Sequence, residues 1–428
     1  MSSKIKILQP VTAISFAFTL ASAAADSGQP ATLAAPAPTS PWTPAASLLL
    51  KQSYDDNVFL QDLGPNADKG SLITTITPNV GLAYKPSDAF NVSLSYAPEV
   101  NIFESQPGEN FTAHRVGLIM GGQVNNSSWD LIDNFIGIEG GDLGPTYLQP
   151  GGSPAAGGPA VRDRRAALIE RGQFRFTQKF GQWFIRPVIS GYDHDFLTLH
   201  KSTEGYQNFV NRSEVSGGGD LGYFVGKDTA LTLGYRYGEW SQAQIFPEIN
   251  PTYYANDYHR VLFGAEGSPY NWLKMNLSFG PEFSHYTGIV EKGFNRDQSY
   301  CFVNASITFI PVKGDTITIS DKSFEQPGFS GRSAYLDSNY DLTWRHKLTD
   351  KLTVGAGVHA YNTDFIKPSA DRNDWIITGS AVASYAFSKQ FSAELSYLYD
   401  SAESEVADTP GREYTRNCVS LGLKYVFK

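Results

Sequence analysis

The stretch Leu231-Thr232-Leu233-Gly234-Tyr235-Arg236-Tyr237 places an apolar residue at every second position. The same alternation recurs at Phe90–Tyr96, Leu273–Phe279 and Val419–Tyr425. Successive side chains of a β-strand point to opposite faces, so the pattern predicts strands with one apolar and one polar face. Alternation alone does not separate a soluble β-sandwich from a membrane barrel.

The lengths of the connections separate the two classes. Short connections lie at 85–88, 125–128, 181–182, 226–228, 268–271, 312–315, 349–350 and 388–390. Long ones lie at 55–70, 103–112, 141–164, 197–208, 241–256, 287–296, 325–333, 364–373 and 401–412. Short and long connections alternate, as in outer-membrane barrels with tight periplasmic turns and longer outer loops. We therefore predict an all-β fold, a transmembrane antiparallel β-barrel of about 18 strands with both chain ends on the periplasmic side.

Aromatic residues support this interpretation because they flank the short turns. The pairs are Tyr84 and Phe90, Phe180 and Trp183, Tyr270 and Trp272, and Phe387 and Phe391. A row of aromatic rings is typical of a membrane interface. A soluble sandwich or propeller, the alternative, has no need to sort its loops by length.

The composition excludes several other classes. Hydrophobic residues make up 41% and charged residues 18% of the 428 residues, so the chain can bury or embed a large surface. Aromatic residues (13%) and 40 glycines favour strands and turns over helices. A net charge of -9 argues against a nucleic-acid partner. Cys301 and Cys418 are the two cysteines; alternation places them on opposite faces, so we predict two free thiols.

The N-terminus has the order of zones found in an export signal. Lys4 and Lys6 precede a mostly apolar stretch at 7–20, and small residues follow at 21–25. Prolines among Ala, Ser and Thr then indicate an extended linker. The predicted organisation is a signal peptide at 1–25, a Pro/Ala-rich periplasmic tether at 26–46 and an outer-membrane β-barrel at 47–428 of a Gram-negative bacterium.

A family resemblance is carried by the first part of the barrel. The run Ser53-Tyr54-Asp55-Asp56-Asn57-Val58-Phe59, followed by a strand with Pro78 and by the segment Tyr84–Tyr96, resembles the putative beta-barrel porin 2 family. The resemblance implies an outer-membrane barrel. Some relatives are encoded beside exopolysaccharide gene clusters, which adds export of a polysaccharide as an implied role.

Charged residues on the polar face provide the candidate functional residues. Five consecutive expected strands turn six arginines inward: Arg171, Arg175, Arg186, Arg212, Arg236 and Arg260. Four strands roughly opposite turn acidic residues inward: Asp337, Asp341, Glu394 and Asp400. Two interpretations stay open. These charges pair with neighbours such as Glu214, Asp220 and Glu266, or they form a transverse field that orients zwitterionic or anionic solutes.

Other motifs give weaker signals. His200-Lys201-Ser202 brings His and Ser together in an expected loop, which chance explains, so no catalytic residue is predicted. In Asp193-His194-Asp195 alternation points the histidine away from both carboxylates, which disfavours a metal site. Gly217-Gly218-Gly219 lacks the residues of a phosphate-binding loop and is better explained by a bend or by a neighbour packed close to the strand.

Two structural details are also predicted. The strand at Trp129–Glu139 and the one after it place Asp133 or Glu170 badly in either register, which favours bulges there. The longest loop, 141–164, is rich in Gly and Pro and poor in apolar residues. It either extends outside the barrel or folds into the lumen as a constriction, and the width of such a barrel favours the constriction.

These features together predict a porin-like channel that passes small hydrophilic, and in particular anionic, solutes. The alternatives are an export conduit for an exopolysaccharide and a structural or adhesin barrel with a closed lumen. Neither an enzyme nor a cofactor or metal is expected. The expected partners are outer-membrane lipid, the barrel-assembly machinery, and small solutes or a polysaccharide.

The N-terminal prediction can be tested directly. Because the charged, apolar and small-residue zones stand in signal order, the mature protein should begin after about residue 25. N-terminal sequencing of protein purified from outer membranes measures this, and a mature chain starting at Met1 would contradict it.

Overall fold

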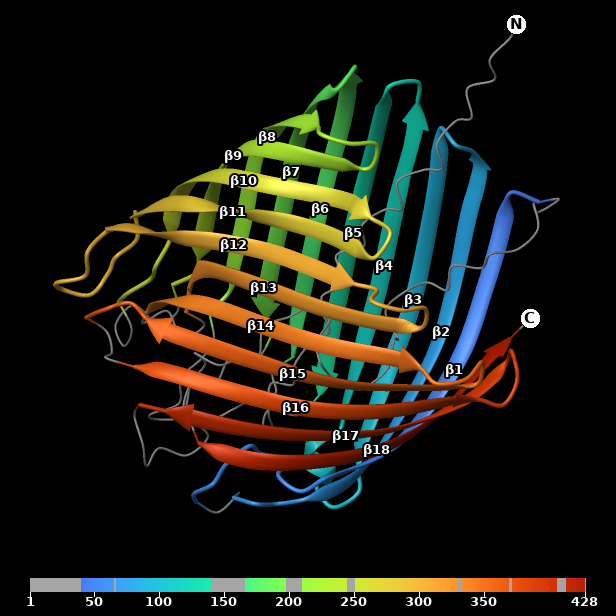
Figure 1. Ribbon diagram of the computed structural model, residues 1–428. Coiled ribbons are helices and arrows are strands. Elements are labelled where there is room, and N and C mark those ends of the chain that lie inside the picture. The colour runs from blue at the N-terminus through green and yellow to red at the C-terminus, as the bar shows by residue number, and fades with distance from the viewer. Residues whose placement is uncertain are drawn as a thin grey trace, which may run out of the picture.

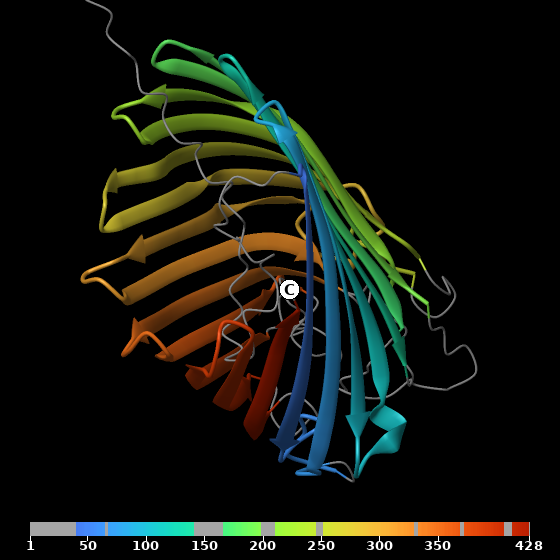
Figure 2. The same ribbon diagram turned by 90° about the vertical axis from the view of Figure 1, so that its right-hand side faces the viewer.

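The computed structural model describes residues 40–64, 67–140, 166–197, 210–244, 251–328, 333–368, 372–405 and 413–427. Eighteen antiparallel strands pair in chain order, and β1 pairs with both β2 and β18, so the sheet closes into a barrel (Figure 1). This confirms the predicted fold class. The blue to green strands form one wall and the yellow to red strands the other (Figure 2).

The strands are 13 to 17 residues long. Their bounds are β1 (Trp42–Asp55), β2 (Ser71–Ser87), β3 (Phe90–Phe103), β4 (Phe111–Val124), β5 (Ser127–Gly140), β6 (Ala167–Phe180), β7 (Trp183–Phe196), β8 (Arg212–Phe224), β9 (Thr229–Gln242), β10 (Asn256–Tyr270), β11 (Leu273–Tyr286), β12 (Asp297–Phe309), β13 (Asp315–Pro327), β14 (Ala334–Lys347), β15 (Leu352–Phe365), β16 (Asn373–Ala386), β17 (Phe391–Ser404) and β18 (Tyr414–Phe427). A single 3-10 turn, η1 (Pro107–Glu109), lies between β3 and β4 within the described residues.

The barrel begins earlier than the sequence predicted. Trp42, placed in the expected tether, is the first residue of β1 and pairs with Tyr84. The centroids of the two rings lie 4.3 Å apart. This aromatic contact at the short-turn end accompanies a strand that includes Pro44 of the expected tether. The expected signal peptide at 1–25 and the first part of the tether lie outside the described residues.

The apolar face of the strands points outward, as predicted. On β18, Val419, Leu421 and Leu423 are each between 41% and 50% exposed, whereas the intervening Ser420 is buried. Tyr270 and Trp272 stack with centroids 5.3 Å apart next to a short turn, and Phe387 and Phe391 do so at 5.1 Å. The outer surface is therefore an apolar belt with an aromatic row at the short-turn end.

Strands β5 and β6 pair without a bulge, contrary to the prediction. Asp130 on β5 forms an ion pair with Arg175 on β6, 2.9 Å between Oδ2 and Nε, which fixes the inward face of both strands. Asp133 and Glu170 then share the outward face. Asp133 is accommodated opposite Gly172, which has no side chain. Register shifts occur instead between β2 and β3 and between β10 and β11.

The ladder between β12 and β13 is short. It contains seven paired positions, from Phe309 with Ile317 to Val303 with Ser323. The ladders on either side, β11 with β12 and β13 with β14, contain thirteen each. Beyond Val303, β12 pairs with β11 alone, and Figure 1 shows β12 running on past the end of β13.

The end of β13 crosses the lumen instead of following the wall. Arg212 of β8 donates from Nη1 to the carbonyl of Pro327, at 2.6 Å, and Gln242 of β9 donates from Nε2 to the carbonyl of Gly328, also at 2.6 Å. Neighbouring strands in a sheet are about 4.8 Å apart, so β13 could not reach β8 and β9 along the wall. We call the segment from Phe324 to Pro327 with its partner residues 334–337 the crossing hairpin.

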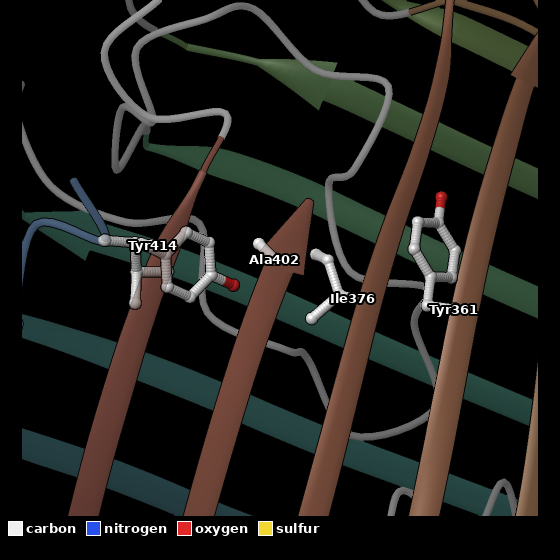
Figure 3. Packing of buried hydrophobic residues seen from close by; sticks show 5 residues of the cluster. Tyr361, Ile376, Ala402 and Tyr414 are labelled. Atoms are coloured by element: carbon white, nitrogen blue, oxygen red, sulfur yellow. The ribbon is translucent and has the colours of Figure 1, made fainter. Parts of the chain in front are cut away.

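Two apolar clusters fill the extracellular end of the barrel. Leu60, from the loop between β1 and β2, packs with Tyr361, Ile376, Ala402 and Tyr414. Figure 3 shows these last four residues on four neighbouring strands. The second cluster joins residues of three long loops to the strands: Tyr254, Tyr286, Phe294 and Ala334, with Val290 and Ile366 beside them.

Both thiols are free, as predicted. Cys301 lies on the outward face of β12, and Cys418 lies on the inward face of β18, 3.8 Å from the Ser420 hydroxyl. Of the described residues, none belongs to a helix long and apolar enough to cross a membrane.

The glycine run on β8 allows a neighbouring strand to approach closely. A Cβ on Gly218 would lie 2.0 Å from the carbonyl oxygen of Tyr235 on β9, whereas a Cβ on Gly217 would meet no atom within 4 Å. The interpretation of this run as a site of close packing is confirmed for Gly218.

Gly218→Ala should therefore destabilise the barrel, by about 1–3 kcal/mol, because β9 must shift to admit the methyl group. Gly217→Ala is the matched control and should be neutral. Loss of the folded, heat-modifiable band in gel electrophoresis with rising urea measures both variants. Equal stability of the two would show that the close approach is unimportant.

Candidate functional site: the charged lumen

All six predicted arginines lie on the inward faces of β6 to β10. The strand registers place Arg171 and Arg175 on β6, Arg186 on β7, Arg212 on β8, Arg236 on β9 and Arg260 on β10. The alternation of apolar and polar residues predicted that these arginines point inward, but it did not show what each guanidinium group contacts.

Two of the arginines share one carboxylate. Arg236 Nη2 lies 2.8 Å from Asp220 Oδ1, and Arg186 Nη1 lies 3.7 Å from Asp220 Oδ2. Arg186 also binds Glu266 on β10, with 2.9 Å between Nη1 and Oε2. The four groups form an alternating row of charges across β7 to β10. Pairing with Asp220 and Glu266, one of the two open interpretations, thus describes these arginines.

Arg260 is held in a buried pair. Its Nε binds the Glu282 carboxylate of β11, and its guanidinium carbon lies 3.7 Å from the centroid of the Phe302 ring. The Tyr300 hydroxyl donates to the same carboxylate. The Arg260 side chain is 12% exposed and that of Glu282 is 1% exposed, so the two charges compensate each other away from water.

Arg171 and Arg212 both approach Tyr192. Their guanidinium carbons lie 4.7 Å and 5.9 Å from the centroid of that ring. Arg212 is buried and, through Pro327, anchors the crossing hairpin. A hydrogen bond of 3.0 Å joins His194 Nδ1 to the Tyr192 hydroxyl. His194 lies on the face of β7 opposite to Asp193 and Asp195. The motif at 193–195 therefore splits between the two faces, as alternation predicted.

The four predicted acidic residues also lie on inward faces, but they differ in environment. Asp341 pairs with His359, 2.7 Å between Oδ1 and Nδ1, and Glu394 accepts from Ser384 at 2.7 Å. Asp337 is fully buried in the crossing hairpin and accepts from Gln326. The bonds from Arg212 and Gln242 to Pro327 and Gly328 bring the end of β13, which pairs with this part of β14, beside β8 and β9.

Asp400 belongs to a buried network that sequence analysis missed. Arg416 on β18 binds Asp400, with Nε 2.7 Å from Oδ2, and its Nη1 lies 3.5 Å from Asp55 Oδ2. Thr378 donates to Asp400 at 2.6 Å. The signal was present, since Asp55 stands in the segment on which the family resemblance rests, but its partner lies at the other end of the chain.

The same segment holds the first loop in the mouth of the barrel. Asp56 accepts from the backbone and side-chain nitrogens of Asn417, at 2.7 Å and 2.8 Å. The Asn57 side chain donates to the carbonyls of Gln61 and Thr415, at 3.1 Å and 2.9 Å. Leu60 is thereby fixed inside the barrel end. This loop and the crossing hairpin fill the mouth; the expected constriction at 141–164 and the motif at 200–202 lie outside the described residues.

A closed barrel with an apolar outer belt, an aromatic row and a charged interior is an outer-membrane β-barrel. The family described as putative beta-barrel porin 2 matches residues 298–427, which span β12 to β18. This confirms the predicted resemblance, although the matched residues are not the ones that suggested it. The chain is therefore an outer-membrane β-barrel whose last seven strands are similar to this family.

Solved structures of outer-membrane proteins are similar to this chain. Acinetobacter baumannii OccAB3 is 11% identical with a TM-score of 0.46, covering 90% of this chain and 99% of that one. Pseudomonas aeruginosa OccK9 (OpdG) is 11% identical with a TM-score of 0.43, covering 90% and 98%. P. aeruginosa OccK2 (OpdF) in complex with glucuronate is 10% identical with a TM-score of 0.45, covering 90% and 98%. No curated protein matches the sequence.

The Arg260 and Glu282 pair gives a prediction about stability. Arg260→Gln should cost about 3–5 kcal/mol, because it leaves the Glu282 carboxylate buried without its counter-charge. Adding Glu282→Gln should recover most of the loss, since no charge then remains at the site. Urea titration of the folded band measures both variants. A double variant as unstable as the single one would show that the ion pair is not the cause.

Proposed function

We propose that this protein is a non-enzymatic channel that passes small hydrophilic solutes, with a preference for anions, across the outer membrane. The observation that carries the proposal is the uneven charge on the inward faces of β6 to β10. Six arginines stand there beside three carboxylates, Glu214, Asp220 and Glu266, while Asp130 of β5 and Glu282 of β11 pair with Arg175 and Arg260. Barrels of this size enclose an aqueous lumen, so such a wall acts on solutes at short range.

Local charge determines selectivity more than the charge of the whole protein. The net charge of -9 opposes the entry of anions. At about 0.15 M salt, however, the Debye length is about 8 Å, so distant charges are screened. Guanidinium groups stay charged at physiological pH and bind carboxylate or phosphate through two parallel hydrogen bonds. Arg171 and Arg236 are the arginines we expect to guide anions.

Export of a polysaccharide is the alternative implied by the family resemblance. A polymer would require the loop at 57–64 and the crossing hairpin to move, since both are packed into the mouth. We also propose that residues 1–25 direct export and that the barrel-assembly machinery inserts the mature chain. The channel proposal requires neither a cofactor nor a catalytic residue.

Ion selectivity in planar bilayers tests the channel. Arg171→Gln with Arg236→Gln should lower the anion-to-cation permeability ratio about fivefold, because one charge at about 4 Å in water contributes about 1 kcal/mol. Lys347→Gln, at an exposed short turn, is the control and should leave the ratio unchanged. An unchanged permeability ratio in the double variant would show that these two arginines do not determine ion selectivity. No conductance at all in the unmodified protein would favour a structural barrel.

A further inference from the structure

The barrel wall has a seam between β12 and β13. On one side of it, Asp297–Phe302 of β12 pair with β11 but not with β13. On the other side, Phe324–Pro327 of β13 pair with β14 alone. Elsewhere among the described strands, the ladders between neighbours contain ten or more paired positions. The seam is therefore a local interruption of the wall.

The seam begins at the height of the outer leaflet and continues to the extracellular end of β12. The paired part of β12 runs from Phe309, beside the aromatic row, to Val303. Seven residues at about 3.3 Å each, with a strand tilt of about 40°, rise roughly 15–18 Å. The apolar belt of such barrels is about 25 Å tall, so the seam begins past its middle, on the extracellular side.

The end of β13 lies nearer to the barrel axis than β11 does, as the contact between Glu325 and Tyr286 shows. Glu325 has the same parity as the outward residue Ile319, yet Glu325 is buried and accepts a hydrogen bond from Tyr286. Tyr286 lies on the inward face of β11. Tyr286 points into the barrel and still reaches the outward side of β13. This is possible only if the end of β13 lies between β11 and the barrel axis. The seam thus leads from the membrane into the space between β13 and the inner face of β11 and β12.

Polar side chains, and no backbone ladder, close this space. Glu325 binds Tyr286, Tyr300 binds Glu282, and Ser284 lies 3.3 Å from the Tyr300 hydroxyl. Among the described residues, Glu325 Oε2 is buried without a hydrogen-bond partner. An unpaired strand edge at the depth of hydrocarbon costs several kcal/mol for each unsatisfied group, and carboxylates there favour a ligand that donates hydrogen bonds.

We propose that the seam is a lateral portal through which an amphiphile of the outer leaflet inserts a hydroxyl- or amine-bearing head group between Glu282 and Glu325. Its acyl chain stays in the membrane, beside the outward face of β12. Entry requires the contacts of Tyr286 and Tyr300 to part, which breaks no strand pairing. This role goes beyond passage of solutes along the barrel axis, and neither role requires the other.

Cysteine labelling by a lipid tests the portal. The background is full-length protein with Cys301→Ser and Cys418→Ser, in phosphatidylcholine vesicles containing phosphatidylethanolamine with a maleimide on its head group. Ser284→Cys places a thiol in the seam and leaves both carboxylates in place. Thr363→Cys is the matched control: it is buried, inward, and, like Ser284, eleven residues after the first residue of its strand, but its strand has complete ladders on both sides.

Mass spectrometry should find several-fold more lipid adduct on S284C than on T363C, with heat-modifiable mobility confirming that each variant is folded. Replacing the host phosphatidylcholine by phosphatidylethanolamine should reduce labelling by competition, because its ammonium group donates hydrogen bonds. Absence of adduct on S284C, or equal labelling of T363C, would overturn the portal. Labelling that is insensitive to the host lipid would overturn the preference for a donor head group. Bilayer conductance is measured separately, so the channel proposal stands or falls independently.

Discussion

The structure depends on one constraint: a backbone that crosses hydrocarbon must satisfy its own hydrogen bonds. A sheet achieves this only by closing, and the pairing of Ala46–Asp55 with Cys418–Phe427 closes it here. The buried triad of Asp55, Arg416 and Asp400 lies at this same closure, so the first and last strands are joined by charge as well as by the ladder. The same closure brings Asn417 next to the first loop, where its backbone nitrogen donates a hydrogen bond to Asp56.

The same constraint gives the seam its importance. Where β13 leaves the wall, its lost pairing with β12 is replaced by contacts across the lumen with Arg212 and Gln242. One displacement therefore has two effects: it narrows the mouth from inside and leaves a polar interruption in the wall outside. The crossing hairpin thus connects the two proposed pathways, along the barrel axis and through its side.

Charge inside the barrel obeys a related rule. A buried charge is stable only when a partner of opposite charge lies beside it. The arginines that matter for folding are therefore those in the most buried ion pairs, such as Arg260 with Glu282. Arg186 and Arg236 share Asp220 in a less buried row. We therefore separate arginines that hold the barrel together from those expected to act on solutes, a distinction that parity of the strand does not make.

The amino-acid sequence by itself determined the strand period, the alternation of short and long connections, the aromatic row and the inward face of the candidate arginines and acidic residues, because these depend on local spacing. It also marked the segment Ser53–Phe59. Only the tertiary structure decided which charges meet, since Asp55 and Arg416 are far apart in the chain, and only it showed β13 crossing the lumen. The outward parity of Glu325, a charged residue where lipid would be expected, was a sign of that departure in the sequence, but only the structure showed that Tyr286 binds this carboxylate.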